Sequence, residues 1–272
     1  MQAMRRLLDI MAQLRDPASG CPWDLAQSYS TIVPYTLEEA YEVADSIQRG
    51  EMTELRDELG DLLFQIVFYC QIAKEEGHFD FNDVASGLCD KMVRRHPHVF
   101  SDAHYENEEE LRHAWEQKKA EERAQGKKAS GPTSHMDGVA RALPALSRAE
   151  KLQKRAARVG FDWPDAQGAL NKVNEELEEV RDEMGQADKD RLQDELGDLL
   201  FSMVNLIRLL GLDAEQSLSR ANAKFERRFR AMENLIHEQG TNSLNELSLQ
   251  QLDTAWERVK RDESNNPAPD SA

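Results

Sequence analysis

The chain has few cysteines, no long apolar run and no recognisable leader segment. Three cysteines among 272 residues are an odd number, and no two of them stand at the spacing of metal ligands. Cys70 and Cys89 fall among apolar residues, which predicts buried thiols in a reducing compartment. No apolar stretch approaches the roughly 20 residues that span a bilayer, and the N-terminus lacks the pattern of a signal peptide. We therefore expect a cytoplasmic protein with no membrane partner.

An excess of positive charge is also missing. The sequence holds 34 lysines and arginines against 51 aspartates and glutamates, so its formal net charge is −17. Such a charge repels DNA and RNA, and we expect no nucleic-acid partner. Most of these acids need no explanation beyond solubility, but some of them recur in a fixed pattern.

The sequence contains two copies of one segment. Residues 37–64 and 174–201 align without a gap at a shift of 137 residues, and both end in the eight letters DELGDLLF. Downstream, KMVRRH resembles KFERRF at a shift of 133, and WEQKK resembles WERVK at a shift of 141. Upstream, GCPWD at 20–24 is loosely similar to GFDWP at 160–164. The plain conclusion is a duplication.

The periodicity of both copies is helical. Between residues 52 and 73 the apolar positions form one stripe of an amphipathic helix, with Leu55, Leu59, Leu62 and Ile66 as members. Thr36 followed by Glu39 predicts a capping box at a helix start, and Gly50 separates two helices. No alternating run of strand length occurs, so we predict an all-α fold of two tandem helical bundles.

Composition predicts the domain boundaries. Gly, Ser, Pro and Lys replace periodic apolar residues at 121–138, which is typical of a flexible linker. We expect an N-terminal helical domain at 1–120, a C-terminal helical domain at 139–262 and a disordered tail at 263–272. Because each copy makes a thin core, we also expect a homodimer.

Each copy carries four carboxylates as two pairs at i, i+3, and each pair borders the apolar stripe of its helix. Packing through the stripes brings the four acids together, where they repel one another unless a cation binds. An all-oxygen ligand set suits Mg²⁺, with Mn²⁺ as an alternative. For any single acid, a merely solvated helix face remains the alternative. The predicted ligands are Glu39, Glu42, Glu58 and Asp61 in the first copy and Glu176, Glu179, Glu195 and Asp198 in the second.

Basic residues downstream offer partners for phosphate groups. Lys224, Arg227 and Arg228 occupy one helical turn, and Trp256 with Lys260 follows at a distance that suits contact with a nucleoside. Solvated surface cations and a core tryptophan are the open alternatives.

The carboxylate pattern resembles a known signature. Glu-Glu-x-x-Glu, then fifteen residues, then Glu-x-x-Asp is similar to the motif of the MazG family of all-α nucleoside triphosphate pyrophosphohydrolases, and the similarity covers about 1–262. The resemblance implies Mg²⁺-dependent cleavage of (deoxy)ribonucleoside triphosphates at the α–β phosphoanhydride, broad base tolerance and a homodimer. It implies that the two quartets are metal ligands, that Lys224 and Arg228 hold the triphosphate, and that Trp256 lies against the nucleoside.

Two further hypotheses concern roles within the site. Glu38 or Glu175, beside the ligands, can accept a proton from the attacking water. The second copy has Lys172 and Arg191 where the first has Tyr35 and Glu54, which favours the second copy as the better enzyme. Two other functions stay open: a metal-free helical interaction protein and a pyrophosphatase restricted to dUTP or dCTP.

Overall fold

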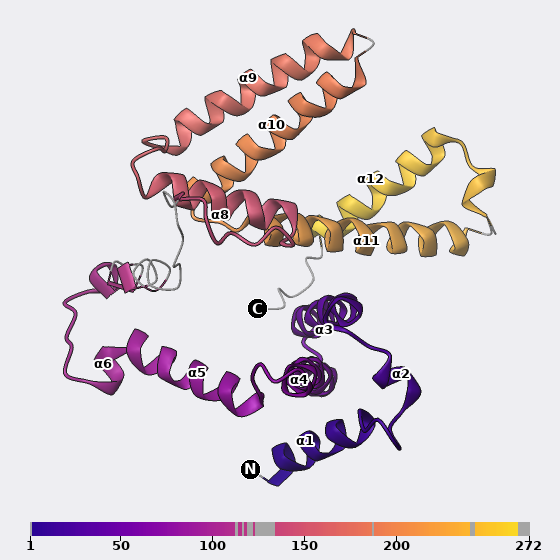
Figure 1. Cartoon of the computed structure of the whole chain (residues 1–272). Helices are drawn as coiled ribbons and strands as arrows, with labels where there is room; N and C mark the ends of the chain where they lie inside the picture. The colour runs from indigo at the N-terminus through magenta and orange to yellow at the C-terminus, as the bar shows by residue number, and fades with distance from the viewer. Residues whose placement is uncertain are drawn as a thin grey trace. The chain divides into compact units, whose positions relative to one another are not determined.

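A computed structural model of the chain describes residues 2–111, 114–115, 117–118, 122, 134–186, 188–239 and 243–265 (Figure 1). These residues form α-helices and one short 3-10 helix without any strand, which confirms the all-α prediction. The chain divides into two compact units, Met1–Lys127 and Lys128–Ala272. Within the described ranges, no helix is long and apolar enough to cross a membrane. Most of the predicted linker lies outside the described residues, so the domain boundaries stay predictions.

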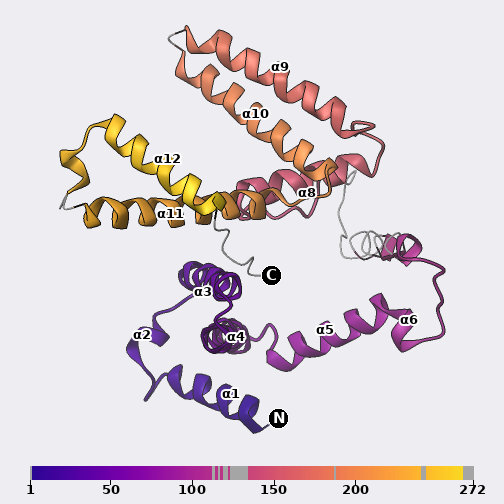
Figure 2. The same ribbon diagram turned by 180° about the vertical axis from the view of Figure 1, so that it is seen from behind.

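The first unit is built around one helical hairpin. Helices α3 and α4 run antiparallel and pack along their length, and α1 packs across α4 (Figures 1 and 2). Gly50 ends α3 in a left-handed conformation with φ of 73°, which a residue with a side chain adopts only at a cost. The helices of this unit are α1 (Gln2–Leu14), α2 (Pro22–Leu25), α3 (Tyr29–Arg49), α4 (Met52–Glu75), α5 (Phe81–Arg95) and α6 (Pro97–Phe100).

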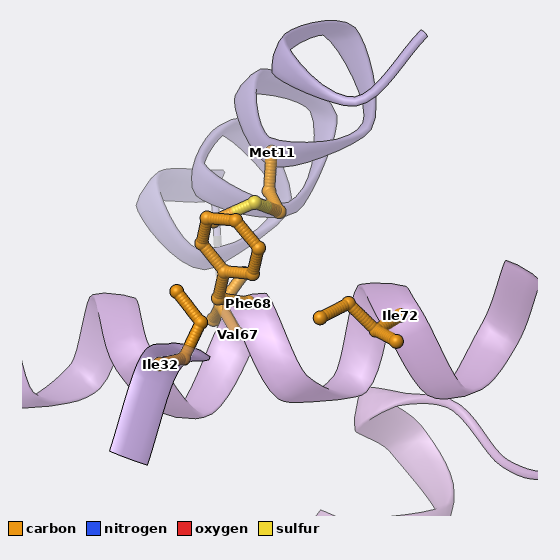
Figure 3. Packing of buried hydrophobic residues seen from close by; sticks show 5 residues of the cluster. All are labelled: Met11, Ile32, Val67, Phe68 and Ile72. Carbon is orange, nitrogen blue, oxygen red and sulfur yellow. The ribbon is translucent and has the colours of Figure 1, made fainter. Parts of the chain in front are cut away.

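The core of the first unit lies where α1, α3 and α4 meet. Its buried members are Met11 from α1, Ile32 from α3, and Val67, Phe68 and Ile72 from α4 (Figure 3). The Phe68 ring lies beside both Met11 and Ile32 in this view. Removing such apolar surface from water is the main stabilising contribution to a small helical core.

Helix α3 begins earlier than predicted. Ser28 is its N-cap: the Ser28 hydroxyl accepts from the Thr31 amide, and the Ser28 amide donates to the Thr31 hydroxyl at 2.8 Å. The capping box predicted at Thr36 is therefore wrong, because Thr36 lies inside the helix and its hydroxyl is 2.8 Å from the Tyr69 hydroxyl. Pro34 does not stop α3, since a proline this near a helix start removes little of the intrahelical hydrogen bonding.

One predicted thiol environment also differs. Cys70 is buried in α4 as expected, whereas Cys89 is exposed. Its helix, α5, extends from the end of α4 and buries none of its own residues, so apolar neighbours in sequence do not enclose the Cys89 thiol.

The second unit repeats the hairpin and adds another. Helices α9 and α10 run antiparallel like α3 and α4, α8 packs against α10 and α11, and α11 pairs with α12 (Figures 1 and 2). Helix α12 continues to Asn265, so the first three residues of the predicted disordered tail are helical. The elements are α8 (Ala145–Ala157), α9 (Ala166–Met184), α10 (Lys189–Leu209), α11 (Ala214–Glu238), η1 (Leu244–Glu246) and α12 (Leu249–Asn265).

Candidate functional site

Each helical hairpin gathers three of its four predicted carboxylates. In the first unit, one carboxylate oxygen from each of Glu39, Glu58 and Asp61 lies within 4.8 Å of the other two. In the second unit, the same holds for Glu176, Glu179 and Glu195. The helices place them because residues at i, i+3 share one face, and the antiparallel packing sets the two faces against each other.

The fourth predicted ligand differs between the two clusters. Glu42 of α3 lies outside the first cluster, although its carboxyl group is close enough to Glu58 to raise the pKa of that residue. Asp198 of α10 is exposed and lies outside the second cluster. The structure therefore brings six of the eight predicted ligands together.

The electrostatics of both clusters are those of acids held too close together. Burial raises the pKa of Glu39, and the charges of Asp61, Glu42 and Glu58 raise it further against a hydrogen bond from Gln65. A hydrogen bond with Glu176 raises the pKa of Glu179, and desolvation adds to it. A group of carboxylates that resists ionisation is short of positive charge, and a bound cation supplies it.

The second cluster fits a divalent metal ion. Glu176 is only 5% exposed, and its Oε2 atom is buried without a hydrogen-bond partner among the described residues. A buried carboxylate oxygen left in this way is costly unless a ligand reaches it. The donors are all oxygens on two packed helices, which matches the preference of Mg²⁺ and Mn²⁺.

The two cations predicted near the second cluster take different positions. Lys172 Nζ lies 2.7 Å from carboxylate oxygens of both Glu175 and Glu176, so it is part of the cluster. Arg191 instead lies 3.8 Å from Glu183, toward the turn of the hairpin.

The acid that takes the place of Arg191 in the first unit is not an unpaired charge. Glu54 forms an ion pair with Arg49. The repulsion that we expected Glu54 to exert on substrate is therefore weakened by its partner.

The two candidate proton acceptors lie beside the clusters on the exposed side of their helices. Glu175 is linked to the second cluster through Lys172, which it shares with Glu176. Glu38 is exposed next to Glu39. Both roles stay predictions.

The remaining predicted substrate ligands lie in the α11–α12 hairpin. Arg228 Nε and Arg227 Nη2 both bind the carboxylate of Glu263, at 2.6 and 2.5 Å. Lys260 pairs with Glu257 at 2.7 Å, and Lys224 is exposed. The Trp256 ring centroid lies 5.3 Å from that of Phe225, which agrees with the core alternative for this tryptophan.

Sequence reasoning missed Glu263. The first unit contains the same arrangement, because Arg94 and Arg95 both bind Glu122, at 2.7 and 2.5 Å. Glu122 and Glu263 are related by the shift of 141 residues that relates the two tryptophan motifs. Extending that alignment beyond the tryptophan motifs would have revealed both glutamates.

Comparison with known proteins agrees with the repeat. The MazG nucleotide pyrophosphohydrolase domain matches residues 27–100 and again 166–232. The chain is 52% identical over 265 residues to the nucleoside triphosphate pyrophosphohydrolase of Escherichia coli strain K12, covering 97% of this chain and 99% of that protein. It is 42% identical over 254 residues to the nucleoside triphosphate pyrophosphohydrolase/pyrophosphatase MazG of Thermotoga maritima, covering 93% and 94%. The chain belongs to the MazG family of nucleotide pyrophosphohydrolases.

Proposed function

We propose that the chain hydrolyses ribo- and deoxyribonucleoside triphosphates at the α–β phosphoanhydride, with broad base tolerance, to nucleoside monophosphate and pyrophosphate. The observation that supports the proposal most directly is the carboxylate cluster with the orphaned Glu176 oxygen, in a chain similar to named nucleoside triphosphate pyrophosphohydrolases. The cofactor is Mg²⁺, with Mn²⁺ as a substitute.

The residues of the second unit divide the chemical work. Glu176, Glu179 and Glu195 hold the metal ion, with Asp198 one turn beyond Glu195. When bound, the ion supplies Lewis acidity toward the phosphate oxygens and lowers the pKa of a coordinated water. Glu175 accepts the proton of the attacking water, and Lys172 holds Glu175 in place through their 2.7 Å contact.

The first unit offers a second, parallel set. Glu39, Glu58 and Asp61 hold a metal ion there, Glu42 approaches from the same face, and Glu38 is the proton acceptor. We assign the main activity to the second unit because Lys172 contacts its ligands, whereas Tyr35 stands at the equivalent place in the first.

The basic residues of α11 and α12 bind the triphosphate. Lys224 and Arg228 carry this role, with Arg227, Arg191 and Lys260 as further cations. Because Glu263 holds both arginines, substrate phosphate has to compete with that carboxylate. Trp256 as a nucleoside contact stays a prediction, as do the homodimer, the cytoplasmic location and the absence of nucleic-acid and membrane partners.

A single assay tests the proposed reaction. The full chain is incubated with a mixture of nucleoside triphosphates and Mg²⁺ in ¹⁸O-labelled water. We expect pyrophosphate and labelled monophosphate as first products, and loss of turnover when a chelator removes the metal. Orthophosphate as the first product contradicts cleavage of the α–β bond. Absence of turnover together with an unchanged melting temperature on adding Mg²⁺ supports the interaction-protein alternative instead.

A further inference from the structure

A cavity of about 440 Å³ opens in the second unit, where α8, the loop before α9 and the C-terminal half of α10 meet. Its walls are largely aromatic, formed by Phe161, Trp163 and Phe201. Gln153 from α8, and Asn205 and Arg208 from α10, add hydrogen-bonding groups. Apolar walls with a few convergent polar groups are typical of sites for small planar ligands.

The first unit fills the same region with its core. Under the alignment of the two hairpins, Phe68 stands where the second unit has Asn205, and Ile32 stands where it has Ala169. Under the alignment of GCPWD with GFDWP, Met11 corresponds to Lys151. Met11, Ile32 and Phe68 are fully buried against one another (Figure 3). The second unit has replaced three packed apolar side chains by one shorter amide, one methyl group and one exposed lysine.

One buried polar atom of the cavity lacks a partner. Gln153 is only 5% exposed, and its Nε2 atom donates to the Phe201 carbonyl at 2.8 Å. Its Oε1 atom is buried and accepts no hydrogen bond from the described residues. This orphaned acceptor is worth retaining only if a donor on a ligand reaches it.

The aromatic walls are positioned before any ligand binds. The Trp163 ring packs on Gly168, where an added Cβ atom would come within 2.9 Å of the ring. The Gly168 amide donates to the Asp165 carboxylate that caps α9, which fixes the backbone under the ring. Phe161, in contrast, is 81% exposed and forms an open wall that a flat ligand can cover.

The cavity adjoins the second carboxylate cluster along one helix. Phe201 follows Glu195 by six residues, roughly 9 Å along the axis of α10 at 1.5 Å per residue. A triphosphate held at the cluster therefore has its nucleoside within reach of these walls.

We propose that this cavity binds the base of the nucleoside triphosphate, stacked on Phe161 and Trp163 and hydrogen-bonded to Gln153 Oε1. The inference rests on the proposed function and assigns base contacts to the second unit alone. Aromatic stacking tolerates any base, because every base has a π face, and this agrees with broad base tolerance.

The experiment compares two variants with a matched control. Asn205→Phe introduces the residue that the first unit carries at this position and fills the cavity. Phe161→Ala removes an exposed wall that contributes little to folding. Phe100→Ala is the control, because Phe100 is also exposed, at 58%, and belongs to the first unit. Each is assayed with ATP, GTP, CTP and UTP and with methyl triphosphate, which has no base.

We expect both cavity variants to raise KM for the four nucleotides by about tenfold, as expected for loss of one stacking contact. Turnover of methyl triphosphate stays at the wild-type level, as do all values for Phe100→Ala. Unchanged KM for every nucleotide, or an equal loss with methyl triphosphate, overturns the base-binding proposal while the proposed reaction stands.

A binding measurement separates this proposal from the proposed function. If the wild-type chain hydrolyses no triphosphate, the proposed function fails. Calorimetric titration with an α,β-methylene nucleoside triphosphate then decides the cavity: about tenfold weaker binding to Asn205→Phe supports it, and equal binding overturns it.

Discussion

Glu176 and Glu179 belong to the cluster that combines crowded acids with a nearby lysine. Lys172 contacts Glu176 at 2.7 Å, and the Glu176 Oε2 atom remains without a protein partner. Glu42, which corresponds to Glu179 under the shift of 137 residues, lies outside the first cluster. Equivalent positions in the two copies thus differ in their relation to the metal ligands.

We predict that Glu179→Ala lowers kcat/KM for nucleoside triphosphates by at least about 100-fold, because it removes a metal ligand of the more active unit. Glu42→Ala lowers it less than about threefold. Steady-state kinetics with several triphosphates measures both. If Glu42→Ala abolishes turnover and Glu179→Ala leaves it intact, the main activity lies in the first unit.

A second residue pair supports the first unit from within. Arg15 is 8% exposed and donates to the Glu75 carboxylate and to the Asp24 carbonyl at 2.6 Å. Burial raises the pKa of Glu75, but hydrogen bonds from Arg15 and Gln71 outweigh it and leave the pKa lowered. A lowered carboxyl pKa contributes stability above its unfolded value, near 4.3, and loses it as pH falls through the folded value.

We predict that Glu75→Gln reduces the free energy of unfolding by about 2 kcal/mol at pH 7, a value discounted because Glu75 is partly exposed. The difference from wild type shrinks below pH 4, where Glu75 itself becomes protonated. Urea unfolding followed by circular dichroism at both pH values measures it. Asp90→Asn, at an exposed position of α5, serves as the control. A deficit that is constant with pH argues against the ion pair as its cause.

At the scale of helices, each unit joins two segments through a pair of adjacent arginines. Arg227 and Arg228 of α11 bind Glu263 of α12, and Arg94 and Arg95 of α5 bind Glu122. Hydrogen bonds from Arg95 and Arg94 lower the pKa of Glu122 to about 2. The duplication has preserved this connection together with the hairpins.

We predict that Glu263→Gln lowers KM for nucleoside triphosphates several-fold, because Arg227 and Arg228 then lose a competing carboxylate. The melting temperature falls by a few degrees, since the pair is half-exposed and contributes about 1 kcal/mol. Glu122→Gln, the equivalent change in the first unit, should lower the melting temperature without changing KM. An unchanged KM for Glu263→Gln would mean that the two arginines only join the helices.

At the scale of the whole molecule, large apolar side chains remain on the surface of the α9–α10 hairpin, among them Leu177, Leu196, Leu200 and Met203. Exposed apolar surface of this kind commonly marks a protein–protein interface. Two small helical units also bury a limited share of their surface on folding. Both observations favour association of two chains through their hairpins.

We predict a homodimer of about 62 kDa by light scattering, twice the 31.0 kDa of one chain. Leu200→Lys should shift the species toward the monomer, because a charge in an apolar interface is costly. Arg56→Leu, on the exposed side of α4, provides a control for surface substitution. A 31.0 kDa species for the wild-type chain at micromolar concentration contradicts the prediction.

Local patterns were enough to predict much of this protein from its sequence. The duplication, the helical class and the hairpin ended by Gly50 all depend on residues close together in the chain or on direct self-similarity. The i, i+3 spacing also predicted six carboxylates that meet, because the helix itself sets which side chains share a face. Glu42 and Asp198 fell outside the clusters because crossing geometry decides which member of a pair points inward.

Only the tertiary structure decided how the duplicated hairpins differ. Whether position 68 or 205 fills a core or lines a cavity depends on the residues of a helix far away in the chain, Met11 in one unit and Lys151 in the other. The same holds for Arg227 and Arg228, whose partner Glu263 lies 35 or more residues away. Packing and ion pairing between distant segments depend on three-dimensional proximity, which no local spacing in the sequence records.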